Sequence, residues 1–263
     1  QLKPLEPVEG LDCSCFFDWD YEYQGLSQVK QVYAVTDLAE ESWRGNRSLD
    51  PTDVAAVGRE VSSGLPMPRF AALADSETVT GAQRGTAVHK FIQLADLHPE
   101  LAMELFVEKE LDRLVKVGLL SAEEAQLVDP KIVARFFNSD LGQRFFTPGI
   151  KVERELEFTS ALSVEELAGG HGLVDGLPLT GKKSNRGDFV ILRGVIDCVL
   201  DFGSELVVVD FKTDRVESKQ VNEYAARYFS QVRYYAKALE KIRGKLVSEK
   251  YLAFLTTGVN IQI

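Results

Sequence analysis

Asp197, Asp210 and Lys212 are the residues whose types and spacing most clearly suggest chemistry. Asp197 follows a short β-branched run, and Asp210 follows the apolar run 206–209, with Gly203-Ser204 between the two runs. Two β-branched runs joined through Gly-Ser are typical of a β-hairpin with a type II′ turn. The sequence therefore predicts two adjacent antiparallel strands, each carrying an aspartate near its end.

A two-residue loop at Gly203-Ser204 fixes the register of this hairpin. Counting outward from the loop, Asp197 pairs with Asp210, and Val195 pairs with Lys212. Because side chains alternate along a strand, Asp197, Asp210 and Lys212 are predicted to share one face of the sheet.

Two carboxylates that face each other across a strand pair are unfavourable. Directly opposed Cβ atoms lie roughly 4.5–5.5 Å apart, and like charges at that distance destabilise a sheet. A divalent cation between the carboxylates would remove the conflict. The pair thus predicts a metal site with a lysine beside it, although an isolated Asp-x-Lys at the end of a strand also occurs by chance.

Composition sets the broad class of protein. The chain has 263 residues, of which 45% are hydrophobic and 27% are charged, which suits one large or two small globular domains. It has no apolar run of about 18 residues, so no membrane-spanning segment is expected. The start, Gln1-Leu2-Lys3-Pro4, has no signal pattern and suggests a piece of a longer polypeptide. Three cysteines (Cys13, Cys15, Cys198) suggest a reducing compartment, the cytosol.

The distribution of charge matters more than its sum. The net charge is −10, yet residues 181–263 hold 14 of the 30 Lys and Arg and only 10 of the 40 Asp and Glu. The part that carries the hairpin is therefore basic, which keeps nucleic-acid binding open. Four basic residues at the start of this region either follow a phosphate backbone or only solubilise a loop: Lys182, Lys183, Arg186 and Arg193.

The remaining chain is predicted to alternate between helices and strands. Residues 1–33 predict an extended linker, and residues 45–80 a long loop. Helices are predicted over 36–43, 81–97, 103–117 and 223–243, and two more begin at the capping box at 121 and at 129. Strands are predicted over 152–159 and 251–255. Residues 168–187 are predicted to form a Gly-rich basic loop. This order predicts an α/β domain over 34–263 with a helical insert at about 100–147.

Six segments occur in an order that resembles a known family. They are Gly85-Thr86-Ala87-Val88-His89, 152–158 (VERELEF), 194–197 (GVID), 209–214 (VDFKTD), Tyr228-x-x-Gln231-x-x-x-Tyr235 and 249–252 (EKYL). The set resembles the nuclease domain of the PD-(D/E)XK superfamily, RecB branch, and is similar to the C-terminal nuclease domain of AddA-type helicase–nuclease subunits. The resemblance implies a restriction-endonuclease-like core, a central mixed sheet flanked by helices.

The resemblance also assigns roles. It implies that His89, Asp197, Asp210 and the Phe211 carbonyl bind the catalytic cation, and that Lys212 is the catalytic lysine. The cation is expected to be Mg²⁺, and the imidazole makes Mn²⁺ credible as well. Lys212 would position or deprotonate the attacking water, or stabilise the developing charge.

His89 has its own local setting. Without the motif, a histidine beside the apolar face of its helix is usually a packed residue. Gly85, one turn earlier, would allow close backbone approach. The nearby helix N-terminus is expected to keep the imidazole neutral.

Four further residues belong to the predicted site or its surroundings. Gln231 and Tyr235 match a motif that supports the site and contacts DNA. Tyr228 lies on an apolar helical stripe and is expected mostly to pack. Glu155 is either a carboxylate of the site, behind the metal ligands or at a second metal, or an exposed strand residue.

The implied function is that of a Mg²⁺-dependent deoxyribonuclease. It would be the exonuclease domain of an AddAB-type helicase–nuclease in the bacterial cytoplasm, acting in double-strand break repair and recombination. Its partners would be DNA, covalently preceding helicase domains and an AddB-type subunit, with no membrane. Neither the four cysteines of an iron–sulfur cluster nor the ATP-binding motif G-x-x-x-x-G-K-[ST] occurs. The alternatives are a non-catalytic DNA-binding or scaffolding module with this fold, and a standalone RecB-family exonuclease.

Overall fold

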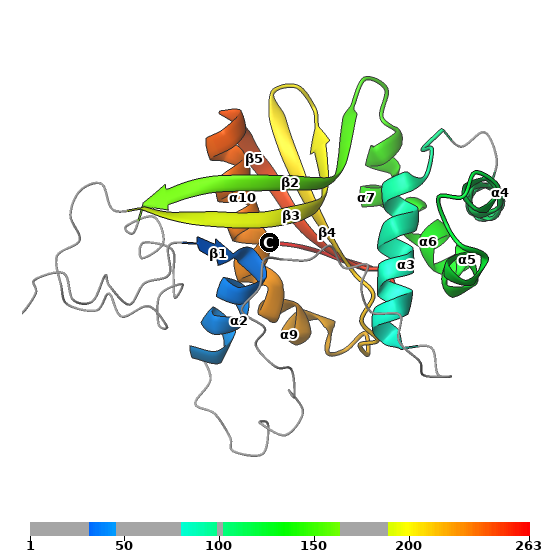
Figure 1. Cartoon of the computed structure of the whole chain (residues 1–263), viewed down its shortest axis with the longest axis horizontal. Helices are drawn as coiled ribbons and strands as arrows, with labels where there is room; N and C mark the ends of the chain where they lie inside the picture. Colours follow the sequence, from blue (N-terminus) through cyan, green and yellow to red (C-terminus); the bar gives the residue numbers. More distant parts are fainter. Residues whose placement is uncertain (1–31, 46–79, 99–101, 164–188) are drawn as a thin grey trace, which may run out of the picture.

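The protein is built on a six-stranded mixed sheet (Figure 1). A computed structural model of the chain describes residues 32–45, 80–98, 102–163 and 189–263. The strands are β1 (Val32–Ala34), β2 (Lys151–Ser163), β3 (Phe189–Asp201), β4 (Glu205–Lys212), β5 (Leu246–Phe254) and β6 (Val259–Gln262), in the order β1-β3-β4-β5-β6, with β2 paired to β3. The predicted α/β class, a mixed sheet flanked by helices, is confirmed.

Several predicted features lie outside the described residues. They are the linker up to residue 31, the loop over 46–79, the Gly-rich loop with Lys182, Lys183 and Arg186, and the cysteines Cys13 and Cys15.

Helices cover both faces of the sheet and divide the core into two clusters. The α10-side core lies beneath α2 (Val35–Gly45), α9 (Val221–Ala225) and α10 (Phe229–Arg243). The α3-side core is formed with α3 (Gly81–Leu94), α4 (Met103–Lys116), α5 (Ala122–Leu127), α6 (Pro130–Phe137), α7 (Asp140–Gln143) and the 3₁₀ turn Arg144–Phe146. Strand β4 alternates between the two, as a strand buried on both faces must: Val208 packs in the first cluster and Val209 in the second.

Local capping explains where the helices begin. Capping boxes open α3 at Thr80 and α5 at Ser121, and Asp129 caps α6, which begins at Pro130. Each satisfies backbone N–H groups that have no partner within the helix. The predicted starts of these helices are confirmed, whereas α3 ends at Leu94 and not at 97.

The β3–β4 hairpin has the predicted turn and register. The Phe202 N–H donates to the Glu205 carbonyl at 3.0 Å, and Gly203 has the left-handed φ of 89° that the turn requires. The ladder runs from Asp201↔Leu206 to Cys198↔Val209 and ends there. The predicted pairings of Asp197 with Asp210 and of Val195 with Lys212 are therefore wrong, because the two strands separate immediately after Cys198↔Val209.

This separation opens the sheet beside Asp197. Strand β2 pairs along β3 from Lys151↔Asp201 to Ser163↔Phe189, except that Glu155 and Asp197 are left out of the register. The opposite edge of β3 is shared between β4, at residues 198–201, and β1, at residues 191–193. Residues 194–197 lie between these two partners. Asp197 is thus the first residue of β3 beyond the hairpin ladder.

At the same level, β2 and β3 bend sharply (Figure 1). Beyond the bend, the residues of each strand that faced one core face the other, a change called here the face exchange. Ile196 packs in the α10-side core and Cys198 in the α3-side core, although regular alternation would keep them together. On β2, Leu156 and Val152 differ in the same way. Between them Glu155 has a φ of 49°, in the left-handed region that disfavours side chains.

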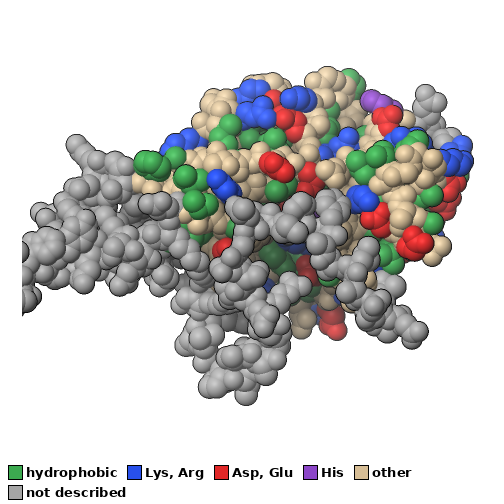
Figure 2. Space-filling model, viewed as in Figure 1, with side chains coloured by type: hydrophobic (Ala, Val, Ile, Leu, Met, Phe, Trp, Pro, Cys, Tyr) green, Lys and Arg blue, Asp and Glu red, His purple; other side chains and the backbone are tan. Residues whose placement is uncertain are grey.

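Several elements differ from the prediction, among them α7, the 3₁₀ turn Arg144–Phe146 and β5, which begins at Leu246 and not at 251. Strands β1 and β6 were not predicted, and the helix expected over 223–243 is broken into α9, a 3₁₀ turn at Ala226–Tyr228, and α10. Within the described part of the chain, no helix is both long and apolar enough to cross a membrane. Lys and Arg side chains are interspersed with Asp and Glu on the face seen in Figure 2, so this view shows no patch of a single charge.

Candidate metal centre

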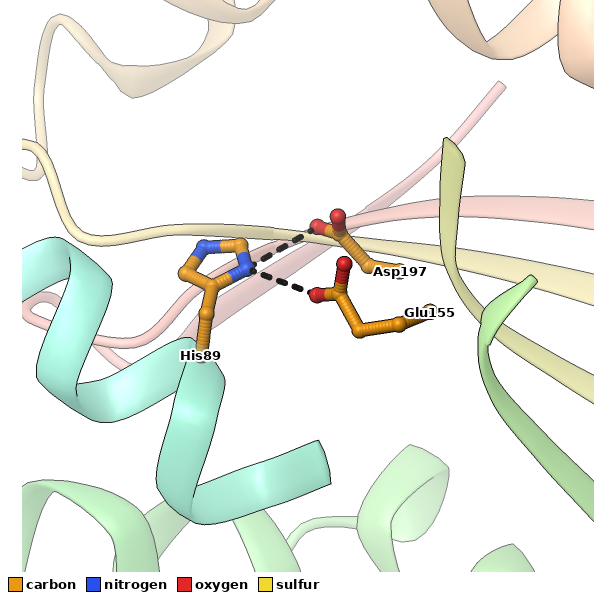
Figure 3. A group of neighbouring side chains, drawn as sticks. All are labelled: His89, Glu155 and Asp197. Atoms are coloured by element: carbon orange, nitrogen blue, oxygen red, sulfur yellow. Dashed lines mark ion pairs between the residues drawn. The ribbon is translucent and has the colours of Figure 1, made fainter. Parts of the chain in front are cut away.

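Three side chains from three distant parts of the chain converge beside the opening in the sheet. His89 comes from α3, Glu155 from β2 and Asp197 from β3, and they point toward one another (Figure 3). His89 Nδ1 lies 3.5 Å from Asp197 Oδ2 and 3.9 Å from Glu155 Oε1. One potential ligand atom of each residue lies within 4.8 Å of the others, which is close enough for a single cation to contact all three.

Gly85 allows α3 to bring His89 to this place. A Cβ atom at residue 85 would lie 2.7 Å from Oγ1 of Thr213, which follows β4. The close approach expected at Gly85 is therefore present, and it is made to the segment just beyond Lys212.

Arg154 fixes the other end of α3. Its Nη1 donates hydrogen bonds to the carbonyls of Ile92 and Ala95, at 2.9 and 2.5 Å, in the last turn of the helix. These carbonyls have no partner inside the helix, so the guanidinium both caps α3 and ties it to β2. Arg154 precedes Glu155 and so links the helix of His89 to the strand of Glu155. Sequence reasoning missed this residue, because nothing local distinguishes it from an exposed strand arginine.

The side chain of Asp197 accepts a backbone hydrogen bond from β4 just beyond the end of the hairpin ladder. Its Oδ2 accepts a hydrogen bond of 2.8 Å from the backbone N–H of Phe211. The Phe211 ring is buried on the α3 side, 6.2 Å from the imidazole of His89 in an edge arrangement. The role of the Phe211 carbonyl as a ligand stays a prediction.

Asp210 and Lys212 form the second part of the site. Asp210 is 1% exposed, and its Oδ2 lies 2.7 Å from Lys212 Nζ. Gln231 Nε2 donates to Asp210 Oδ1 at 3.1 Å and to the Tyr235 hydroxyl at 2.8 Å, and Lys212 Nζ donates to Gln231 Oε1 at 3.4 Å. The structure thus brings the predicted residues Asp210, Lys212, Gln231 and Tyr235 into one network.

Tyr228 contacts this network directly. Lys212 Nζ lies 4.2 Å from the centroid of its ring. The Tyr228 hydroxyl donates to Asp214 Oδ2 at 3.4 Å, and the Tyr224 hydroxyl donates to Asp214 Oδ1 at 3.2 Å. Sequence reasoning expected Tyr228 to be mostly packing and did not single out Asp214 or Tyr224.

Burial and the neighbouring carboxylates shift the pKa values of Asp210 and His89. Burial raises the pKa of Asp210, and the charge of Asp197 raises it further, while Lys212 and His89 oppose the shift. Burial alone would lower the pKa of His89, but Asp197, Glu155 and Asp210 raise it above its usual value. The shift is opposite in direction to the one expected from the helix N-terminus, because α3 begins at Gly81, about two turns before His89, whereas the carboxylates lie beside the imidazole.

The residues fit a divalent cation. Asp210 Oδ2 is enclosed, and the ammonium of Lys212 lies 2.7 Å from it. The carboxylates of Asp197 and Glu155 converge on the imidazole of His89, with one potential ligand atom of each residue within 4.8 Å of the others. Carboxylate oxygens with one imidazole are a donor set for Mg²⁺ or Mn²⁺.

The arrangement is typical of one class of enzyme. An Asp and an Asp-x-Lys on adjacent strands of a mixed sheet, next to a helix that supplies a histidine, define a metal-dependent nuclease core. A comparison with known protein families matches residues 62–259 to the PD-(D/E)XK nuclease superfamily. The chain belongs to this superfamily.

Curated relatives place the chain within a longer protein type. It is 33% identical over 261 residues to the AddA-type ATP-dependent helicase/nuclease subunit of Geobacillus kaustophilus, a match that covers 93% of this chain and 19% of the relative. The corresponding subunit of Acetivibrio thermocellus is 30% identical over 258 residues, covering 98% of this chain and 19% of the relative. The chain therefore spans about a fifth of the length of these relatives.

Proposed function

We propose that this domain is a Mg²⁺-dependent deoxyribonuclease that acts as the exonuclease of an AddA-type helicase–nuclease. The observation that carries the proposal is the convergence of His89, Glu155 and Asp197 beside the Asp210–Lys212 pair. Histidine, carboxylates and a lysine in one place supply the groups that metal-assisted phosphodiester hydrolysis requires.

His89, Asp197 and Asp210 would hold the cation, with the Phe211 carbonyl as a further ligand. Mg²⁺ bound there would polarise the scissile phosphate and lower the pKa of a bound water. Glu155, 3.9 Å from His89 Nδ1, would orient the imidazole or extend the carboxylate set.

Lys212 would act on the water or on the phosphate. Its ammonium is held between Asp210 and Gln231, and its side chain is 14% exposed. From this position it can orient or deprotonate the attacking water, or stabilise the negative charge that develops on the phosphate. Gln231 would hold the side chains of Asp210 and Lys212 in fixed positions, because it forms hydrogen bonds with both and with Tyr235.

The biological setting is also part of the proposal. The relatives are named helicase/nuclease subunits, and this chain matches 19% of their length. The domain would then degrade a DNA strand delivered by preceding helicase domains, together with an AddB-type subunit, during repair and recombination of double-strand breaks.

Digestion of DNA labelled at one end, single- and double-stranded, tests the activity. The wild-type chain should shorten the labelled strand in Mg²⁺ and be silent in EDTA, and Asp210→Asn should lower the rate by at least about 100-fold. The matched control is Asp201→Asn, which removes a carboxylate from the other end of the same hairpin, where Asp201 pairs with Lys245. A wild type that binds DNA but never cuts it would indicate a non-catalytic binding module instead.

A further inference from the structure

The ammonium of Lys212 is enclosed by more than its carboxylate partner. Asp210 Oδ2 lies 2.7 Å from Lys212 Nζ, and the ring centroid of Tyr228 lies 4.2 Å from it. A cation within about 6 Å of an aromatic centroid is attracted by the electrons of the ring face. Tyr228 therefore gives the ammonium a second attractive contact that does not neutralise its charge.

The Tyr228 ring is itself held in place. Both oxygens of Asp214 are used, since Oδ2 accepts from the Tyr228 hydroxyl at 3.4 Å and Oδ1 from the Tyr224 hydroxyl at 3.2 Å. The two rings contact each other edge to face, with centroids 5.9 Å apart. Asp214 lies two residues beyond Lys212, so the segment that carries the lysine also carries the anchor for the ring.

The break between α9 and α10 places Tyr228 where its ring meets Lys212. Tyr228 ends the 3₁₀ turn Ala226–Tyr228 and is the N-cap residue of α10, with φ −105° and ψ −5°. One turn further on, Gln231 reaches Asp210 and Lys212 from the same helix. The start of α10 thus places an amide and an aromatic face against one ammonium.

We propose that Tyr228 is a positioning residue for Lys212, and that Asp214, with Tyr224, fixes the ring against the ammonium. The proposal deepens the proposed nuclease function and depends on it for its catalytic consequence. It assigns to Asp214 a role in catalysis exerted through Tyr228, without contact with metal or substrate.

The test separates the ring from its anchor. Tyr228→Leu removes the ring, Tyr228→Phe keeps it and removes the hydroxyl, and Asp214→Asn weakens the anchor. Tyr251→Phe is the matched control, because the Tyr251 hydroxyl also donates to a carboxylate, that of Glu249. For each variant, kcat and KM on end-labelled single-stranded DNA are measured, with Mn²⁺ affinity by calorimetry.

A second readout reports the geometry without catalysis. A methylene group over an aromatic ring has its NMR signal shifted upfield, so the ε-methylene of Lys212 should be displaced in the spectrum of lysine-labelled protein. Lys212→Arg identifies the signal by removing it.

The expected pattern is specific. Tyr228→Leu should abolish the upfield shift and lower kcat about tenfold, with KM and Mn²⁺ affinity changed less than about twofold. Tyr228→Phe should retain much of the upfield shift and of kcat. Asp214→Asn should give values between those of Tyr228→Phe and Tyr228→Leu, and Tyr251→Phe should match wild type.

Two results would overturn the proposal. One is a Lys212 signal that is unshifted in the wild type, or unchanged in Tyr228→Leu. The other is a fold-loss of Mn²⁺ affinity in Tyr228→Leu as large as its fold-loss of kcat, or a clear drop in its melting temperature. Either would make the ring a packing residue. A wild type that shows the shift but cuts no DNA would sink the proposed function and leave the positioning contact standing.

Discussion

Replacing Glu155 by glycine should make the metal-free protein more stable than replacing it by glutamine. Both substitutions remove the negative charge that faces His89 Nδ1, 3.9 Å away. Glutamine keeps the rest of the side chain, and glycine removes all of it from Cβ onward. Glu155 is the one residue other than glycine with a positive φ in the described part of the chain, at 49°. Backbone strain at Glu155 is therefore read from this comparison relative to the same comparison at a strand position with an ordinary φ.

The size of the effect follows from two opposing terms. An L-residue in the left-handed conformation costs about 1–2 kcal/mol. Glycine in a strand costs about 0.5–1 kcal/mol in chain entropy. The difference between the two terms is about 0–1.5 kcal/mol with a midpoint of about 0.75 kcal/mol, so Glu155→Gly should be more stable than Glu155→Gln by about 0.75 kcal/mol, or about 1.5–3 °C in melting temperature.

Glu157 provides the control. It lies two residues along the same strand, is exposed, and pairs with Val195 in the regular ladder. Here glycine has no strain to relieve, so Glu157→Gly should be less stable than Glu157→Gln. Thermal melting of the four variants in EDTA gives both differences. If glycine is the less stable substitution at both positions, the strain at Glu155, and the face exchange that depends on it, are refuted.

Three other perturbations have defined outcomes. Gly85→Ala should destabilise the fold by about 1–3 kcal/mol, because the added Cβ would lie 2.7 Å from Thr213 Oγ1. Gly81→Ala, whose Cβ would have nothing within 4 Å, should not destabilise it. Equal melting temperatures of the two variants would contradict the close approach at Gly85. In Glu110, burial would raise the pKa, but hydrogen bonds from Arg113 and a backbone N–H lower it, so the stability it contributes is present above its unfolded pKa and lost as the pH falls through the folded one. Urea unfolding should therefore show Glu110→Gln less stable than wild type at neutral pH, with the gap closing below about pH 4.5, and a gap that widens in acid would be the wrong sign. Mg²⁺ at 100 times its dissociation constant should add about 2.7 kcal/mol, or roughly 5–11 °C, to wild type and much less to Asp210→Asn; identical shifts would place the ion elsewhere.

The sequence predicted what local rules determine. The capping boxes at Thr80 and Ser121 and the Gly203-Ser204 turn satisfy backbone groups or torsions within a few residues of themselves. For the same reason the hairpin register could be counted from its turn as far as Cys198↔Val209, where the ladder ends, but not to the predicted Asp197–Asp210 pair.

Features that depend on tertiary contacts were missed. Strand β1 has three residues and forms by parallel pairing with β3, far along the chain. The break before α10 places Tyr228 against Lys212, and no Pro or Gly marks it in the sequence. The face exchange at Glu155 involves two strands at once, and a period of two read on either strand alone cannot reveal it.

The candidate site shows the same division. Its residue types followed from the Asp…Asp-x-Lys spacing and from resemblance. The structure places His89, Glu155 and Asp197 in one group and Asp210 with Lys212 in another. What could not be predicted is which neighbours hold them: Arg154 on the end of α3, Thr213 against Gly85, and Asp214 on Tyr228. These contacts join segments far apart in the chain or depend on how a loop folds back.

Anomalous diffraction from a crystal soaked in Mn²⁺ tests the central claim most directly. The account predicts a peak with a His89 nitrogen about 2.0–2.3 Å away and with carboxylate oxygens of Asp197 and Asp210 at similar distances. A peak bound by the carboxylates with the His89 nitrogen more than about 3.5 Å away would remove His89 from the site. The absence of any peak between His89, Asp197 and Asp210 would contradict the metal centre itself.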